Sequence, residues 1–90
     1  MSTAAVQYKI MPEGLDINLE EVKEIAKKKI EEMGGVFSNS EEQPVAFGLK
    51  ALIISLAFPE EKEIDELGNE LQKLPGVSSA EMIDYRRALG

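Results

Sequence analysis

Carboxylates are the most abundant side chains in this sequence that could do chemistry. They gather in EEQ, residues 41–43, and in PEEKEIDE, residues 59–66. Such runs could bind a divalent cation or supply a general acid and a general base. They are more often solvated surfaces or helix N-termini stabilised by the helix dipole, and the second run directly precedes a helical pattern. We therefore interpret both runs as solvated surface.

The side chains that most often perform catalysis are absent. The 90 residues include no cysteine and no histidine. Disulfides and thiolate metal sites are therefore excluded, and the usual general base and commonest metal ligand are missing. Ser55 has no histidine to activate it as a nucleophile, and there is no glycine-rich phosphate-binding loop. These absences make an enzyme less expected, although one that uses carboxylates or lysine stays possible.

The charge of the chain indicates which partners it can bind. The formal net charge is −7, whereas proteins that bind nucleic acid usually carry a basic face. The run Lys27 to Lys29 lies in a segment rich in glutamate, which is typical of a solvated helix face. RNA-reading sheets display aromatic rings on an open face. Here Tyr8 stands between Val6 and Ile10, a pattern that indicates core. We expect no direct contact with nucleic acid.

The sequence also lacks signals for membranes. The N-terminal residues MSTAAVQYKIMPEG have no basic segment followed by an apolar one, as a secretory signal would. The longest largely apolar segment, ALIISLAF at residues 51–58, is far shorter than a membrane span. We expect a cytoplasmic protein whose partners are other proteins or small molecules.

Two pairs of residues remain as candidates for binding. Phe47 and Gly48 stand just before the long apolar segment. Phe47 either packs in the core, with Gly48 permitting a β-bulge, or is presented to a partner; the residues alone favour the core. Arg86 and Arg87 close the acidic chain. They form either a solvated end, which the residues favour, or a short basic tail beyond an anchored strand that inserts into a partner.

The first half of the chain predicts a strand and a helix. Residues 5–11 alternate apolar and polar side chains, which is typical of a half-buried strand. Asn18 is a good helix N-cap, with Glu21 at the capping-box spacing. Gly34 and Gly35 end this helix. Its single apolar stripe comprises Leu19, Val22, Ile25, Ala26, Ile30 and Met33.

The second half is less uniform. Val36 and Phe37 could begin a strand, and the polar segment SNSEEQ after them is typical of a turn. Residues 44–47 could form a second short strand at the edge of the sheet, because they begin with proline. Residues 49–58 predict a central strand, with Lys50 near its start where the side chain reaches water. A second helix follows, whose apolar stripe comprises Ile64, Leu67, Leu71 and Leu74. Gly68 inside it lowers the stability of the helix, because glycine is a poor helix former. Residues 77–85 predict the last strand.

This order predicts an α+β fold of the ferredoxin-like type, β-α-β-β-α-β. Right-handed crossovers through two helices place both helices on one face of a four-stranded antiparallel sheet. The other face must then be polar or covered by a partner. We expect residues 1–90 to form a single domain, since the length suits one and no linker is evident.

Four segments together give the sequence a family resemblance. KIMPEG, EEQPVAFGLKAL, LPGV and DYRRALG resemble the archaeal members of the elongation factor 1-beta family over nearly the whole chain. These are guanine nucleotide exchange factors of the GTPase elongation factor 1-alpha. The resemblance implies the same α/β sandwich and a chain that promotes replacement of bound GDP by GTP during polypeptide elongation. Such a factor makes and breaks no bond, so it needs neither histidine nor cysteine. The resemblance therefore implies a protein that is not an enzyme and that has no metal site and no cofactor.

The resemblance also implies site residues. Phe47 matches a family phenylalanine on the partner-binding surface, Gly48 follows it in the same motif, and Lys50 fits the GLK pattern. In eukaryotic relatives a near-terminal lysine reaches the magnesium and switch region of the GTPase. This chain ends instead with Arg86, Arg87, Ala88, Leu89 and Gly90. The resemblance therefore implies a partner-binding surface of Phe47, Gly48, Lys50, Arg86, Arg87 and Leu89.

Other function classes remain open to the sequence. We expect a monomer when the chain is free of its partner. The alternative is a small-molecule-binding regulatory module, since domains of this fold often bind effectors at sheet edges or between copies, and fold alone does not decide function. A third class, an acid/base enzyme, would need a cleft with converging carboxylates.

Overall fold

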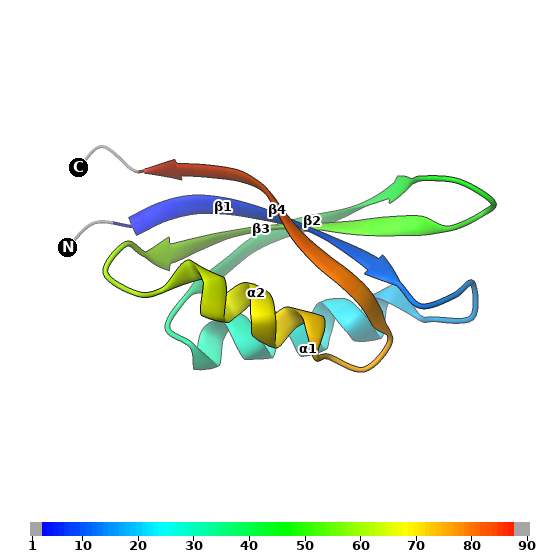
Figure 1. Ribbon diagram of the computed structural model, residues 1–90, viewed down its shortest axis with the longest axis horizontal. Helices are drawn as coiled ribbons and strands as arrows, with labels where there is room; N and C mark the ends of the chain where they lie inside the picture. Colours follow the sequence, from blue (N-terminus) through cyan, green and yellow to red (C-terminus); the bar gives the residue numbers. More distant parts are fainter. Residues whose placement is uncertain (1–2, 88–90) are drawn as a thin grey trace.

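Six elements alternate along the chain in the predicted order. The computed structural model describes residues 3–87. The elements are β1 (Thr3–Pro12), α1 (Leu19–Glu32), β2 (Val36–Pro44), β3 (Lys50–Pro59), α2 (Ile64–Gln72) and β4 (Val77–Arg87). The strands pair antiparallel in the order β2-β3-β1-β4, and both helices lie on one face of the sheet (Figure 1). The predicted ferredoxin-like α+β fold is confirmed.

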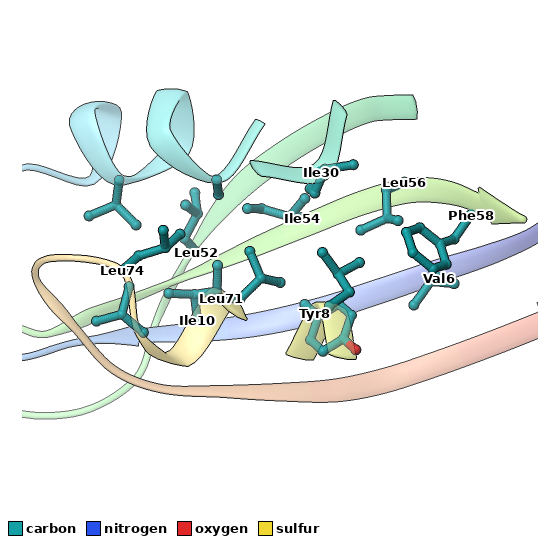
Figure 2. Packing of buried hydrophobic residues seen from close by; sticks show 14 of the residues in the cluster. Val6, Tyr8, Ile10, Ile30, Leu52, Ile54, Leu56, Phe58, Leu71 and Leu74 are labelled. Carbon is teal, nitrogen blue, oxygen red and sulfur yellow. The ribbon is translucent and has the colours of Figure 1, made fainter. Parts of the chain in front are cut away.

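The core lies between the sheet and the two helices. Alternate residues of β1 and β3 face the helices and are buried, as their spacing predicts. The buried stripes of α1 and α2 meet them (Figure 2). The largest fully buried side chains are those of Phe58, Ile10, Ile30, Ile54, Leu67, Leu71 and Val6. Burial of this apolar surface is the main favourable term for folding.

The first helix begins and ends where the sequence indicates. The side chain of Asn18 accepts a hydrogen bond from the backbone N–H of Glu20 at 2.9 Å, which satisfies one of the free amides of the first turn. Gly34 follows the helix with a φ of +94°, a conformation that glycine adopts without strain. Lys62, from the loop before α2, donates to the backbone carbonyl of Met33 at 2.8 Å and so satisfies one of the last carbonyls.

Strand β2 corrects two expectations. The polar segment SNSEEQ is not a turn but lies inside the strand, and residues 45–47 are not strand. The reason is pairing: β3 offers β2 a full-length edge, from Ala57 opposite Val36 to Lys50 opposite Pro44. Polar residues are tolerated there because β2 is an edge strand with most of its side chains exposed. Pro44 is its last residue, which agrees with the prediction that proline marks a sheet edge.

Strand β4 corrects a third expectation, and helix α2 a fourth. β4 does not end at Tyr85, because Arg86 and Arg87 continue it opposite Ala5 and Ala4 of β1. The arginine pair is therefore part of the sheet and not a tail beyond it. Helix α2 ends at Gln72, so Leu74, which was expected on its apolar stripe, follows the helix and is buried there.

Gly68 is explained by its neighbour in the core. The hydroxyl of Tyr8 donates to the carbonyl of Ile64 in the first turn of α2, at 3.2 Å, and Figure 2 shows Tyr8 beside this helix. Burial, with a smaller contribution from Asp65, raises the pKa of Tyr8, so the hydroxyl stays protonated and donates. A Cβ on Gly68 would lie 3.0 Å from this hydroxyl oxygen. The glycine therefore makes room for the tyrosine.

We predict that Gly68→Ala destabilises the protein, although alanine is the better helix former by about 1 kcal/mol. In a Tyr8→Phe background the closest contact of the new methyl group is removed, so there the same substitution is neutral or stabilising. Urea unfolding of the wild type, the two single variants and the double variant measures this coupling. Equal effects of Gly68→Ala in both backgrounds would show that the hydroxyl is not the constraint.

Candidate partner-binding surface

The hairpin between β2 and β3 turns through Phe47 and Gly48. The backbone N–H of Val45 donates to the carbonyl of Leu49 at 2.9 Å, and the N–H of Leu49 donates to the carbonyl of Ala46 at 2.9 Å. Phe47 has a φ of +53° and Gly48 a φ of +80°. Positive φ at both central positions is the feature of type I′ turns, whose twist matches that of the strands they join. The conformation of the hairpin tip is thus determined by Phe47 and Gly48.

Phe47 is presented to solvent. Its exposed fraction is 94%, and it contributes nothing to the core. The core interpretation that the residues alone favoured is therefore wrong. The backbone of Phe47 is in the left-handed region, which costs a bulky residue roughly 1–3 kcal/mol and is common at functional sites. The turn therefore exposes an aromatic ring to water at a cost in conformational free energy.

Lys50 stands two residues after the turn, as the first residue of β3. Its side chain is exposed, as predicted, and its Nζ lies 3.8 Å from Oε1 of Glu42 on the paired strand. Nearby on α1, the pKa of Lys23 is raised by its hydrogen bond to Glu20 and by the charge of Glu20, with smaller contributions from Glu24 and Glu42. The surface beside the hairpin therefore carries mixed, exposed charges.

A groove runs between the hairpin and the loop that joins β1 to α1. Its volume is about 330 Å³, and its lining includes the apolar residues Leu15, Leu19 and Leu49. Leu15 is exposed to 71%. Motif spacing does not single out this residue. The only signal in the sequence is a leucine inside the otherwise turn-forming segment PEGLDIN.

The two arginines lie away from the hairpin tip. Figure 1 shows the β2–β3 hairpin at one end of the sheet and the end of β4 at the other. Arg86 pairs with Asp84 (Nε to Oδ2, 3.2 Å) and Arg87 with Glu60 (Nε to Oε1, 3.5 Å). Both arginine side chains are more than three-quarters exposed. The structure thus brings Phe47, Gly48 and Lys50 together and places the arginines elsewhere, while Leu89 lies outside the described residues.

In the described part of the chain, the remaining chemical candidates do not assemble into a site. Within residues 3–87 no three carboxylates are placed to hold a metal ion. The hydroxyl of Ser55 accepts a hydrogen bond from Nε2 of Gln7 at 3.0 Å on the helix-free face of the sheet. In the same described range, neither helix is long and apolar enough to cross a membrane.

The strain at the hairpin tip predicts the stability of two variants. Phe47→Gly relieves the left-handed conformation and loses no buried contact, so we expect the free energy of unfolding to stay constant or rise by up to about 1 kcal/mol. Gly48→Ala introduces strain at a φ of +80° and should cost about 1 kcal/mol. Urea denaturation measures both. A loss of more than about 2 kcal/mol in Phe47→Gly would mean that the ring stabilises the fold.

Comparisons with known proteins identify a family. The family model described as the EF-1 guanine nucleotide exchange domain matches residues 5–87. Elongation factor 1-beta of Methanosarcina barkeri is 38% identical over 88 residues, covering 97% of this chain and 99% of the relative. The protein of the same name from Staphylothermus marinus is 38% identical over 84 residues, covering 91% and 92% of the two chains. That of Methanosphaera stadtmanae is 36% identical over 90 residues, covering 99% and 100%.

A solved structure supports the fold. The C-terminal domain of the MgtC protein from Mycobacterium tuberculosis superposes with a TM-score of 0.63 at 14% identity, covering 92% of this chain and 86% of that one. At this identity the likeness concerns the fold alone. The family follows from the sequence matches: this chain belongs to the EF-1 guanine nucleotide exchange domain family, together with the elongation factor 1-beta proteins.

Proposed function

We propose that this chain binds the GTPase elongation factor 1-alpha through the hairpin tip around Phe47 and so speeds the exchange of bound GDP for GTP. Membership of the exchange-domain family supports the activity. The observation that carries the proposed contact is Phe47 itself, an aromatic ring that is 94% exposed on a strained backbone. Strain of this kind persists only where the surrounding structure enforces it, and it clusters at functional sites.

The exchange needs no bond-making chemistry. A factor that binds the nucleotide-free GTPase more tightly than the GDP-bound form must weaken GDP binding by the same factor, because the two binding events share one thermodynamic cycle. A coupling of about 3 kcal/mol corresponds to a change in GDP affinity of roughly 150-fold. The chain therefore has to supply only differential contacts, which suits a surface built from exposed side chains.

Phe47 is suited to be the main anchor. Burial of an aromatic side chain in a partner removes a large apolar area from water, and such residues dominate interface energetics. The turn already holds the ring's backbone in one conformation, so little backbone entropy remains to be lost on binding. Gly48 makes the turn possible. Lys50 adds a charge beside the ring, and its exposed pair with Glu42 is weak enough to be exchanged for a partner's carboxylate.

Arg86 and Arg87 form a second part of the proposed surface. Their exposed ion pairs with Asp84 and Glu60 are each worth about 1 kcal/mol or less, so a partner's acidic groups can replace them. The described part of the chain extends 42 Å along its longest axis. A partner that contacts both ends of the sheet must therefore span most of this length. Leu89, outside the described residues, belongs to the proposal through the family resemblance.

The proposal includes the state in which the chain acts. We propose that it is a monomer when free and that it works in the cytoplasm with its GTPase. The family assignment favours exchange activity over the alternative of a small-molecule-binding regulatory module. No observation within the described residues favours that alternative.

We expect the wild-type chain to accelerate release of a fluorescent GDP analogue from the cognate GTPase, and Phe47→Ala to slow this by about tenfold or more. The fold of the variant should be intact, since the ring is solvent-exposed. Stopped-flow fluorescence with excess unlabelled GDP measures the rate, and circular dichroism checks the fold. If stoichiometric wild-type protein left the release rate unchanged, the proposed function would be wrong.

Arg86→Ala and Arg87→Ala should each reduce the acceleration several-fold and weaken its dependence on salt, because exposed charges contribute mainly to association. Lys28→Ala is the matched control: it removes one exposed positive charge from α1, outside the proposed surface. The same release assay at two ionic strengths compares the three variants. Equal effects of Lys28→Ala and the arginine variants would show that only net charge matters.

A further inference from the structure

We propose that Leu15, in the loop between β1 and α1, is a second apolar anchor for the GTPase and binds it together with Phe47. This inference rests on the proposed function and extends its contact surface. It places an interaction on two separate loops, so the groove between them becomes part of the interface.

The loop holds Leu15 away from the core. The backbone N–H of Ile17 donates to the carbonyl of Gly14 at 3.4 Å, closing a turn around Leu15 and Asp16. Just before this turn, the N–H of Glu13 donates to the carbonyl of Gly76 at 2.9 Å, which ties the loop to the start of β4. Ile17 packs against the core cluster, whereas Leu15 is exposed to 71%. The exposure of Leu15 is thus fixed by a loop that is anchored on both sides.

Leu15 lies against the hairpin tip. Its Cδ2 atom is 3.4 Å from the position that a Cβ on Gly48 would take, an ordinary van der Waals distance. Both loops are at the same end of the sheet (Figure 1), and Leu15 and Gly48 line the same groove. The leucine is therefore adjacent to the residue that follows Phe47 in the turn.

The exposure of Phe47 and Leu15 distinguishes them from the other apolar residues of the surface. Among the exposed large apolar side chains of the described residues, Phe47 and Leu15 have the largest exposed fractions, 94% and 71%. Val36 follows with 63% and lies at the start of β2, at the opposite end of that strand from the hairpin. Single exposed apolar residues are normal, whereas exposed apolar residues that gather at one end of a molecule mark an interaction site.

The occupant is the GTPase because the groove is continuous with the proposed Phe47 contact. A partner that buries the ring also approaches Leu15, since this leucine lies beside Gly48, the residue that follows Phe47 in the turn. The charged residues around the groove, Glu20, Glu42 and Lys50, would form the polar rim that surrounds an apolar centre in protein interfaces. A second copy of this chain is the competing occupant, and the experiment tells the two apart.

The test compares Leu15→Ser, Leu15→Met and Val36→Ser in the full chain. Equilibrium binding to the nucleotide-free GTPase is measured by titration calorimetry, and GDP release by stopped-flow fluorescence. We expect Leu15→Ser to weaken binding about tenfold, as for loss of a buried leucine, with a midpoint of thermal unfolding close to that of the wild type. Leu15→Met keeps an apolar side chain and should retain binding, and Val36→Ser should match the wild type.

The outcomes separate this inference from the proposed function. If wild-type protein accelerates GDP release but Leu15→Ser binds as tightly as Val36→Ser, the Leu15 contact is refuted while the exchange function stands. If wild-type protein does not accelerate release, the proposed function itself fails. If light scattering shows a wild-type dimer that Leu15→Ser dissociates, the surface binds a second copy, and the inference is overturned. If Leu15→Ser unfolds, Leu15→Ala takes its place: folded Leu15→Ala that binds as tightly as Val36→Ser would refute the contact, and weaker binding would support it.

Discussion

The pairing of β3 with both of its neighbours is the constraint on which the rest of the structure depends. β3 is bonded to β1 from Ile10 opposite Leu52 to Thr3 opposite Pro59, and to β2 along nearly the whole of that strand. The alternation of β3 sends Leu52, Ile54, Leu56 and Phe58 into the core. A slip of one residue would turn all four to the open face, so the buried face fixes the register. That register in turn fixes where the β2–β3 turn falls.

The candidate surface follows from this constraint. Because β2 and β3 are locked together up to Pro44 and Lys50, the residues between them must reverse the chain in a short space. Phe47 and Gly48 do so with positive φ values, and the resulting strain is offset by the folding energy of the whole sheet. The backbone that carries the ring is thus held in place by a strand that is itself largely buried. Rigid display of this kind reduces the entropy lost on binding, which is what a binding surface without catalytic chemistry requires.

The sequence predicts the fold well and the surface only in part. Periodic burial in β1, β3 and both helices identifies these elements, because each depends on its own alternation or stripe. β2 could not be predicted from its polar residues, since it is a strand only because β3 provides an edge to pair with. The exposure of Phe47 depends on the same long-range register, so composition alone wrongly favoured the core. The extension of β4 through Arg87 likewise depends on pairing with Ala4 and Ala5.

The central claim is that the hairpin end of the sheet is the surface that meets the GTPase. The measurement that tests it most directly is a crystal structure of the chain bound to its nucleotide-free GTPase. The account predicts that the Phe47 ring, which is 94% exposed in the free chain, becomes buried against the partner with its turn unchanged. A complex that is active in exchange but leaves Phe47 in solvent would contradict it.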